Sequence, residues 1–460
     1  MLRTVELPLW LLLLILGFAV VTFLSHFLFP SVRWFFRRRM ERAVAELNKR
    51  LDRPIEPFKL ARRHDTVQRL VYDAEVLKAV TEHAEEEGVP ENVAMERARR
   101  YAREIVPSFS AMVYFRIATR AARWLSEKLY DVAVDVPGEG LRDIDPGATV
   151  IFVMNHRSNM DYVLITYLVA ERTTLSYAVG EWARVWPLSW LIRSMGAYFI
   201  RRRSRNALYR RVLARYVQLA TESGVTQAFF PEGGLSLDGR VGPPKLGLLS
   251  YVLSGFDPEA GRDVVFVPVA LNYDRVLEDR VLTRAAEAGE RRFRASVPGV
   301  VWFVIRYVWR RWRGRAVRFG QAGVRFGTPL SLHGFVADEG RAEPREVARA
   351  LMERIRAVVP VLAVPLVARL VQRAGGRVSR AALVAQAQAV LDGDAAALVE
   401  RDAEAVVATG LAGLTSRGVL VEQGDMVEAS PEQAALLEYY AATMAGHPGM
   451  EVADAESATT

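Results

Sequence analysis

Between residues 131 and 335 the chain alternates short runs of β-forming residues with helical stretches, and this alternation constrains the fold more than any other feature. Such alternation is typical of an α/β domain, in which helices cover the faces of a sheet. We therefore predict an α/β domain over 131–335. Its strands are expected at Thr149–Met154, Ser176–Gly180, Ala197–Ile200, Thr226–Phe230 and Val264–Ala270.

The regions on either side of this domain have a helical pattern, with apolar residues at spacings of three and four. Because 460 residues are too many for one ordinary core, we predict two or three cooperating domains. Residues 31–130 are expected to form a basic, membrane-proximal helical region. Residues 336–445 are expected to form a helical C-terminal domain with a small hairpin at Gly418–Val421 and Met426–Glu428. Residues 446–460 have the composition of a flexible acidic tail.

The segment Leu7–Phe29 contains 23 residues without Asp, Glu, Lys or Arg. At about 1.5 Å per residue, a helix of this length crosses a bilayer core of about 30 Å. We predict a membrane anchor over residues 1–30, rather than a signal peptide, because the run is long and lacks a small-residue cleavage site. Arg33 and Arg37–Arg39 follow it, which predicts a cytoplasmic catalytic domain on the inner (plasma) membrane. Shallow re-entrant insertion is the main alternative.

The formal net charge of +8 is unevenly distributed along the chain. Residues 391–460 carry two basic and thirteen acidic side chains, a net charge of −11, which leaves +19 for residues 1–390. Within the basic part, residues 31–63 contain eleven basic and four acidic side chains beside the predicted anchor, an arrangement that attracts anionic membrane lipid. The C-terminal helices and hairpin resemble a winged-helix module, but their negative charge argues against nucleic-acid binding. The chain has no Cys, so a thiolate nucleophile and Cys-ligated metal sites are excluded.

The first block with candidate chemistry is Asn155–Asp161, which follows the run Thr149–Met154 directly. His156 and Asp161 are five residues apart, so both can face one cleft only if the segment combines a loop with a first helical turn. A carboxylate on one imidazole nitrogen leaves the other nitrogen to take a proton from a hydroxyl. His333 and Asp338 have the same spacing without a buried strand before them, so spacing alone is a weak signal.

Three further blocks end predicted strands in charged or glycine-rich segments. Arg201 and Arg202 end the second block, where guanidinium groups are suited to hold a phosphate. The third block, Phe230–Ser236, runs into Gly233 and Gly234, whose backbone N–H groups can approach a ligand. In the fourth block, Pro268 interrupts a strand, which places it at an edge, at a bulge or beside a cleft.

In this order the blocks resemble the four motifs of the glycerolipid acyltransferases. The additional helical regions are most similar to those of the glycerol-3-phosphate and dihydroxyacetone-phosphate acyltransferases of the PlsB type. The resemblance extends over roughly residues 90–430. It is carried by Asn155–Asp161, Gly196–Arg202, Phe230–Ser236 with Pro244–Gly247, Val267–Asn272 and Val324–Leu330.

The resemblance implies a membrane-associated enzyme that moves a fatty acyl group from acyl-CoA or acyl-carrier protein to glycerol 3-phosphate, without a cofactor or a metal. It implies His156 as the general base and Asp161 as the residue that orients it. The remaining implied residues bind substrate: Arg201 and Arg202 the acceptor phosphate, Glu232, Gly233, Gly234, Ser236 and Lys245 the acceptor, and Pro268 the acyl side. Dihydroxyacetone phosphate or lysophosphatidic acid as acceptor, and a non-catalytic membrane-bound pseudoenzyme, are the alternatives.

The third block departs from the family pattern. Leu235 and Leu237 occupy positions where the family usually carries arginines that are thought to grip the acceptor phosphate. Arg240, Lys245 or Arg201–Arg205 are candidates to replace them, unless the acceptor differs or activity is lost.

Overall fold

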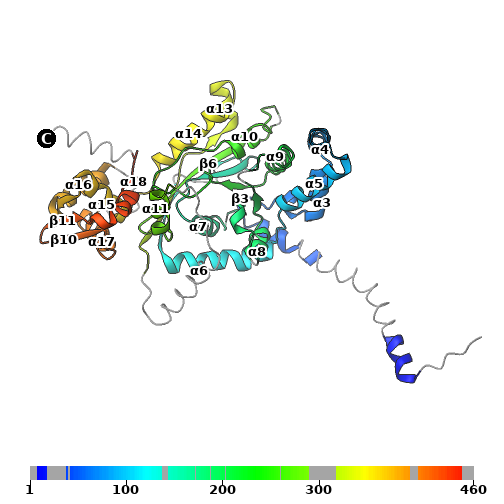
Figure 1. The fold of residues 1–460 in the computed structure, drawn as a ribbon, viewed down its shortest axis with the longest axis horizontal. Helices are drawn as coiled ribbons and strands as arrows, with labels where there is room; N and C mark the ends of the chain where they lie inside the picture. The colour runs from blue at the N-terminus through cyan, green and yellow to red at the C-terminus, as the bar shows by residue number, and fades with distance from the viewer. Residues whose placement is uncertain are drawn as a thin grey trace, which may run out of the picture. The chain divides into compact units, whose positions relative to one another are not determined.

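The computed structural model describes residues 8–17, 38–39, 42–136, 143–170, 172–186, 188–201, 204–259, 261–289, 318–393 and 402–447. The chain divides into two compact units, Met1–Ile55 and Glu56–Thr460. In the first unit, residues 9–17 and 42–48 are helical. The second unit contains the sheets and the remaining helices (Figure 1). The finer domain boundaries stay a prediction.

An eight-stranded sheet lies at the centre of the second unit. Its order is β1-β7-β6-β2-β5-β3-β4, with the short β8 also paired to β6. Strands β6, β2, β5, β3 and β4 run parallel to one another, whereas β7 is antiparallel to β6 and parallel to β1. The strands are β1 (Asp131–Asp135), β2 (Thr149–Met154), β3 (Ser176–Gly180), β4 (Tyr198–Ile200), β5 (Gln227–Phe229), β6 (Val264–Tyr273), β7 (Gln321–Phe326) and β8 (Leu330–Ser331).

The five predicted strands are confirmed as β2 to β6, and the α/β class with them. β2 and β3 have the predicted bounds, whereas β6 continues three residues further, to Tyr273. Every residue of β2 is buried, because successive side chains enter two different cores. Phe152 packs in the core on one face and Val153 in the core on the other.

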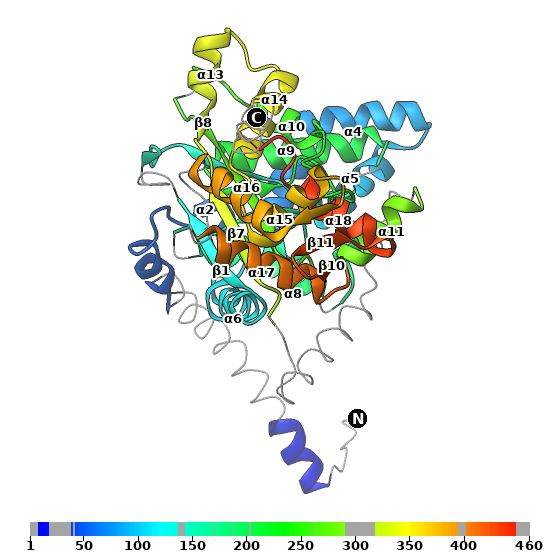
Figure 2. The same cartoon turned by 90° about the vertical axis from the view of Figure 1, so that its left-hand side faces the viewer.

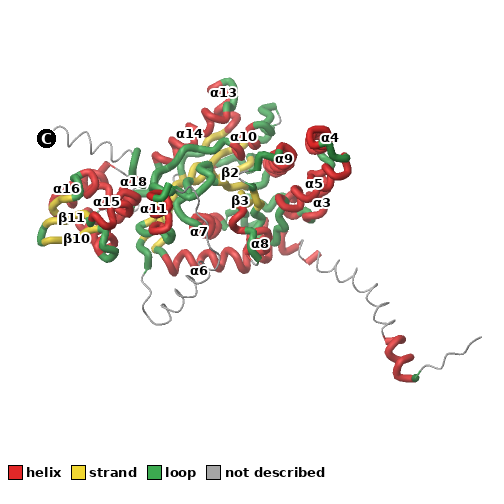
Figure 3. Tube along the Cα trace, viewed as in Figure 1, coloured by secondary structure: helices red, strands yellow, loops and turns green. Residues whose placement is uncertain are grey.

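The two faces of the sheet are covered by different helices (Figures 1 and 3). On the Phe152 face lie α6, α7 and the C-terminal helices, and on the Val153 face lie α3, α4, α5, α9, α10 and α14. The helices up to β8 are α2 (Pro57–Leu60), α3 (Arg63–Val71), α4 (Ala74–Glu87), α5 (Glu91–Ile105), α6 (Thr119–Leu129), α7 (Met160–Val169), α8 (Leu188–Ser194), α9 (Ala207–Glu222), α10 (Gly247–Leu253) and α11 (Asp279–Glu287).

Local sequence signals explain where several of these helices begin and end. The Asp73 carboxylate accepts a hydrogen bond from the Glu75 N–H at the start of α4, and Gly88 ends that helix with a φ of 61°. Asn206 begins α9 in the same way, by accepting from the Tyr209 N–H.

A second, three-stranded sheet of order β10-β11-β9 packs with the C-terminal helices, which face the viewer in Figure 2. The predicted hairpin is confirmed as β10 (Leu420–Gln423) and β11 (Met426–Ala429), with Gly424 in the turn at a φ of 64°. The third strand, β9 (Arg377–Ser379), was not expected. The helices after β8 are α13 (Leu332–Glu339), α14 (Pro344–Ala357), α15 (Ala363–Arg373), α16 (Arg380–Gly393), α17 (Ala403–Thr415) and α18 (Ala434–Ala442).

The predicted membrane anchor lies only partly within the described residues. Residues 9–17 of Leu7–Phe29 are helical, and residues 18–29 are outside the described ranges. Among the residues that the structure describes, no helix has both the length and the apolar character needed to cross a bilayer. A single N-terminal membrane helix is therefore not found in the described part of the chain.

Candidate active site

The first and third sequence blocks meet at one edge of the sheet. β2 and β5 are neighbouring parallel strands, with Val153 opposite Phe229. The loops that follow them therefore leave the sheet side by side, at the edge where open α/β sheets bind ligands. This arrangement brings His156 and Glu232 together.

The Asp161 carboxylate organises the loop after β2. Its Oδ2 lies 2.9 Å from His156 Nδ1 and accepts hydrogen bonds from the N–H groups of Arg157 at 2.7 Å and Ser158 at 3.0 Å. Its Oδ1 accepts a 2.6 Å hydrogen bond from the Tyr273 hydroxyl. Asp161 belongs to the first turn of α7, so the loop and the helical turn combine as the spacing requires. The carboxylate is fully buried, which makes these bonds strong.

The His156 ring is fixed from several sides. It stacks on Phe230 with a centroid distance of 3.9 Å, and Tyr162 meets it edge-on at 5.4 Å. Because Nδ1 faces Asp161, Nε2 is the nitrogen that remains for a substrate hydroxyl. The side chain is only 3% exposed, so His156 has few alternative orientations. This geometry is suited to a general base.

Glu232 ties the two loops together. Its Oε1 accepts a hydrogen bond from the His156 N–H at 3.0 Å, and its Oε2 accepts one from the Gly242 N–H at 2.9 Å. Burial raises the pKa of Glu232 to about 7, although the nearby Arg157 charge and these two N–H groups oppose the shift. Both carboxylate oxygens thus have partners within the protein.

The remaining residues of the third block pack closely around this loop. Gly233 has a φ of 66°, and a Cβ there would lie 2.8 Å from Cδ of Lys245, so the turn needs glycine. The Lys245 N–H donates to the Pro231 carbonyl at 2.7 Å. The Ser236 N–H donates to the His156 carbonyl at 2.8 Å, and its hydroxyl donates to the Arg240 carbonyl at 2.7 Å. Gly234, which lies between Gly233 and Ser236 in the same turn, is half-buried.

Arg201 is not brought to this loop. It follows β4, three strand spacings from β2, or about 14 Å across the sheet. Its guanidinium makes two hydrogen bonds with the Glu104 carboxylate, at 2.8 and 2.6 Å. Arg202 lies outside the described residues. Their predicted role in phosphate binding stays a prediction.

Pro268 lies in the middle of β6, opposite Val153 of β2. On its other side β6 pairs with β8 at Val265 and Phe266 and with β7 from Val269 to Tyr273, so Pro268 falls at the break between these two strands. Its carbonyl still accepts a 2.8 Å hydrogen bond from the Gly327 N–H. The break accommodates a residue that has no N–H to donate.

Three residues near the site were not predicted from the sequence. Asn155 exchanges two hydrogen bonds with the backbone of Leu271, at 3.0 and 2.8 Å, and so clamps the loop to β6. Tyr273 reaches Asp161 from the end of β6. The Glu278 carboxylate accepts from the Ser158 hydroxyl at 2.7 Å and the Asn159 amide at 3.0 Å. Asn155 stands in the first block and could have been noticed there, whereas the other two carry no local signal.

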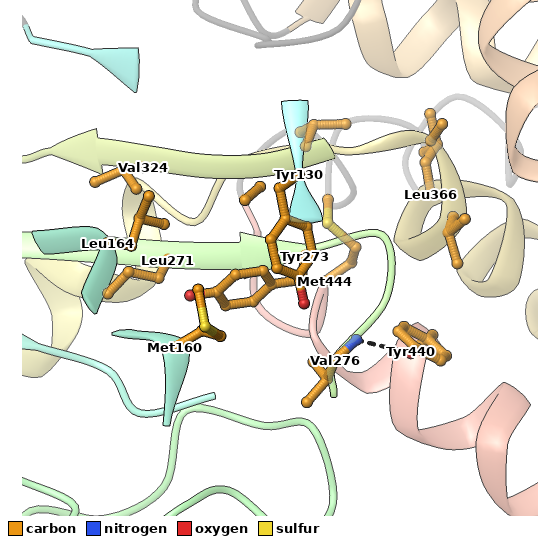
Figure 4. Close-up of a cluster of buried hydrophobic side chains, with 14 of the residues drawn as sticks. Tyr130, Met160, Leu164, Leu271, Tyr273, Val276, Val324, Leu366, Tyr440 and Met444 are labelled. Carbon is orange, nitrogen blue, oxygen red and sulfur yellow. Dashed lines mark hydrogen bonds between the residues drawn. The ribbon is translucent and has the colours of Figure 1, made fainter. Parts of the chain in front are cut away.

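The C-terminal region contacts the elements that support the site. The Tyr440 hydroxyl of α18 accepts a 3.1 Å hydrogen bond from the Val276 N–H. Figure 4 shows this hydrogen bond together with the nearby Tyr273. Arg417 lies 2.6 Å from the Asp279 carboxylate, and the Tyr440 hydroxyl donates to the same carboxylate. Within the described ranges, no group of three His, Asp or Glu side chains is arranged to hold a metal ion.

Comparison with known proteins identifies two regions of the chain. Residues 135–272 match the acyltransferase family model, and residues 305–443 match the model of the glycerol-3-phosphate acyltransferase C-terminal region. The resemblance to the glycerolipid acyltransferases is confirmed over these two regions. The first match contains all of the residues from His156 to Pro268 that the sequence comparison with this family singled out, and the second contains Arg417 and Tyr440.

Curated relatives named glycerol-3-phosphate acyltransferase are similar to this chain. The protein from Pseudomonas syringae pv. syringae is 32% identical over 283 residues, which are 61% of this chain and 33% of the relative. The protein from Shewanella loihica is 31% identical over 331 residues, 71% of this chain and 39% of the relative. The chain therefore spans between a third and two fifths of the length of these relatives.

Among similar solved structures is the 1-acyl-sn-glycerophosphate (LPA) acyltransferase from Thermotoga maritima. It has 20% sequence identity and a TM-score of 0.31, and the match covers 56% of this chain and 79% of that one.

Proposed function

We propose that this chain is an acyltransferase that moves a fatty acyl group from an acyl thioester to a hydroxyl of glycerol 3-phosphate. The observation that carries the proposal is the buried His156–Asp161 pair, at 2.9 Å, on a loop that Glu232 holds beside the neighbouring strand. The names of the curated relatives and the match to the glycerol-3-phosphate acyltransferase C-terminal region support glycerol 3-phosphate as the acceptor.

The proposed reaction needs one base and no covalent enzyme intermediate. His156 Nε2 takes the proton of the acceptor hydroxyl as its oxygen attacks the thioester carbonyl carbon. Asp161 stabilises the imidazolium that forms. When the tetrahedral intermediate collapses, the carbon–sulfur bond breaks, and the leaving thiolate takes the proton from His156. An ester and a free thiol are the products.

Purified protein incubated with labelled acyl-CoA or acyl-carrier protein and glycerol 3-phosphate tests this proposal. We expect labelled lysophosphatidic acid, and loss of activity in His156→Ala. His333→Ala is the matched control, because His333 has the same spacing to a following Asp but lies at the start of α13, near Asp263. Normal turnover by His156→Ala would refute the proposed mechanism.

The same assay with dihydroxyacetone phosphate and lysophosphatidic acid identifies the acceptor. Glycerol 3-phosphate should give the highest kcat/KM. A higher value for another acceptor would reassign the substrate, and absence of transfer to all three would favour a pseudoenzyme.

We also propose that the chain is attached to the cytoplasmic face of the inner membrane through its N-terminal segment. The uncharged run Leu7–Phe29 and the arginines after it support this proposal, as do the exposed side chains of Leu9, Trp10 and Leu13. Flotation with anionic vesicles should recover the full chain, whereas a variant without residues 1–30 should float poorly at high salt. Equal flotation of both at high salt would contradict the anchor.

A further inference from the structure

Arg157, the residue after the proposed base, has a buried side chain without a hydrogen-bond partner among the described residues. Its side chain is 1% exposed, and Nε, Nη1 and Nη2 make no hydrogen bond within the part of the chain that the structure describes. A guanidinium has five N–H donors, and burying it unpaired is unfavourable. A bound anion would supply the missing acceptors.

Two partly buried arginines in this unit have carboxylate partners. Arg201 is bound at two points by Glu104, and Arg417 lies beside Asp279 and Tyr440. Glu232, whose pKa responds to the Arg157 charge, already uses both carboxylate oxygens to accept N–H groups of His156 and Gly242. Among the described residues, no carboxylate is therefore hydrogen-bonded to the Arg157 guanidinium beside the proposed base.

A second buried donor comes from the C-terminal region. Tyr439 of α18 is 1% exposed, and its hydroxyl has no hydrogen-bond partner among the described residues. Tyr439 packs against the loop after β5, because a Cβ on Gly239 would lie 2.0 Å from the Tyr439 carbonyl oxygen. Burial raises the pKa of the Tyr439 hydroxyl, and the nearby Arg157 charge lowers that pKa by a smaller amount. A guanidinium and a neutral phenol in one buried region offer donors suited to an anion.

We infer that Arg157, together with the Tyr439 hydroxyl, binds the phosphate of the acceptor. The inference rests on the proposed function, because it identifies where that reaction holds its acceptor. A short carbon chain separates the reacting hydroxyl of glycerol 3-phosphate from its phosphate, so the phosphate must bind close to His156. The phosphates of acyl-CoA lie far from the thioester, at the other end of the pantetheine arm.

The third block supports this assignment. Leu235 and Leu237, at the positions where the family usually has arginines, pack against the hydrophobic core instead. Arg201 lies three strands away in an ion pair. Arg157 supplies a guanidinium on the His156 side of the sheet. Since it is enclosed, the acceptor enters when the loop that contains Gly233, Gly239 and Gly242 moves away from α18.

The test compares Arg157→Met with the wild-type protein by kinetics and by thermal unfolding. Met fills a similar volume without charge. We expect KM for glycerol 3-phosphate to rise about tenfold or more, with KM for acyl-CoA unchanged, because charged hydrogen bonds to the phosphate are lost. Without ligand the variant should melt no lower than wild type. Inorganic phosphate and glycerol 3-phosphate should raise the Tm of wild type only. Arg349→Met, on the exposed face of α14, controls for loss of charge.

Tyr439→Phe removes only the hydroxyl and should raise KM for glycerol 3-phosphate about threefold to tenfold.

A lower Tm of ligand-free Arg157→Met with an unchanged KM for glycerol 3-phosphate would show that Arg157 is structural. A rise in KM for acyl-CoA alone would assign the site to the donor. If wild type does not acylate glycerol 3-phosphate, the proposed function fails. The phosphate site itself fails if neither inorganic phosphate nor glycerol 3-phosphate shifts the Tm of wild type.

Discussion

Replacing Glu232 with Gln should change how the stability of the protein depends on pH. The carboxyl is 9% exposed, and burial raises its pKa from 4.5 to about 7. Below pH 4.5 both the folded and the unfolded chain hold the proton, so the group has no effect. Between pH 4.5 and 7 the unfolded chain loses the proton first, and the free energy of unfolding falls. At about 1.4 kcal/mol per unit, the total loss is about 3 kcal/mol, and it persists above pH 7.

Gln does not titrate, so Glu232→Gln should escape this loss. It also loses one acceptor, because its amide NH₂ group must face the N–H of His156 or Gly242, at a constant cost of about 1–3 kcal/mol. The stability of the variant relative to wild type should therefore improve by about 2–3 kcal/mol between pH 5 and pH 8. Urea unfolding at both pH values measures this difference. Glu438→Gln, on the exposed face of α18, is the matched control.

An equal stability difference at pH 5 and pH 8 would refute the reasoning, since it would mean that Glu232 is ionised in the folded protein throughout. Kinetics of the same variant separate two roles. If Glu232 positions the His156 loop, kcat falls while KM for the acceptor changes little. If Glu232 binds the acceptor, as the family resemblance implies, KM rises.

Three further substitutions test other contacts. Asp161→Asn replaces the carboxylate beside His156 Nδ1 with a neutral amide and should lower kcat by about 10²–10⁴-fold with a small change in KM, measured by steady-state kinetics. Tyr273→Phe removes the 2.6 Å hydrogen bond to Asp161 and should lower the free energy of unfolding by about 1–3 kcal/mol and kcat by about tenfold, measured by denaturation and turnover. Gly410→Ala would place a Cβ 2.5 Å from the Ala363 carbonyl oxygen between α17 and α15, and should cost about 1–3 kcal/mol in urea unfolding; Gly413→Ala, which meets only the end of the Val364 side chain, should cost less.

Local sequence signals were sufficient for the strands that are buried on both faces. β2 is a run of six buried residues, and all five residues of β3 are buried as well, so their bounds could be read directly. His156 and His333 could not be separated by spacing. The structure separates them, because His156 follows buried β2 and meets Asp161, whereas Asp338 is exposed on α13.

Contacts between distant segments had no such signal. β1 pairs with β7 about 190 residues later, and neither strand was predicted. Tyr273 reaches Asp161 across 112 residues, and Glu278 reaches Asn159 across 119. Hydrophobic periodicity reports which face of an element is buried, but it does not report which polar side chain of another element that face will meet.

The C-terminal region and the proposed catalytic loop depend on two adjacent carboxylates. Glu278 holds Ser158 and Asn159, while Asp279, the next residue, is held by Arg417 and Tyr440 of the C-terminal region. A displacement of α18 would therefore move the segment that positions the loop after β2. One hydrophobic core also spans both regions, from Val267 of β6 to Leu366 of α15. Removing the C-terminal region would expose this core and leave Asp279 buried without its cation, so we do not expect the acyltransferase region to fold alone.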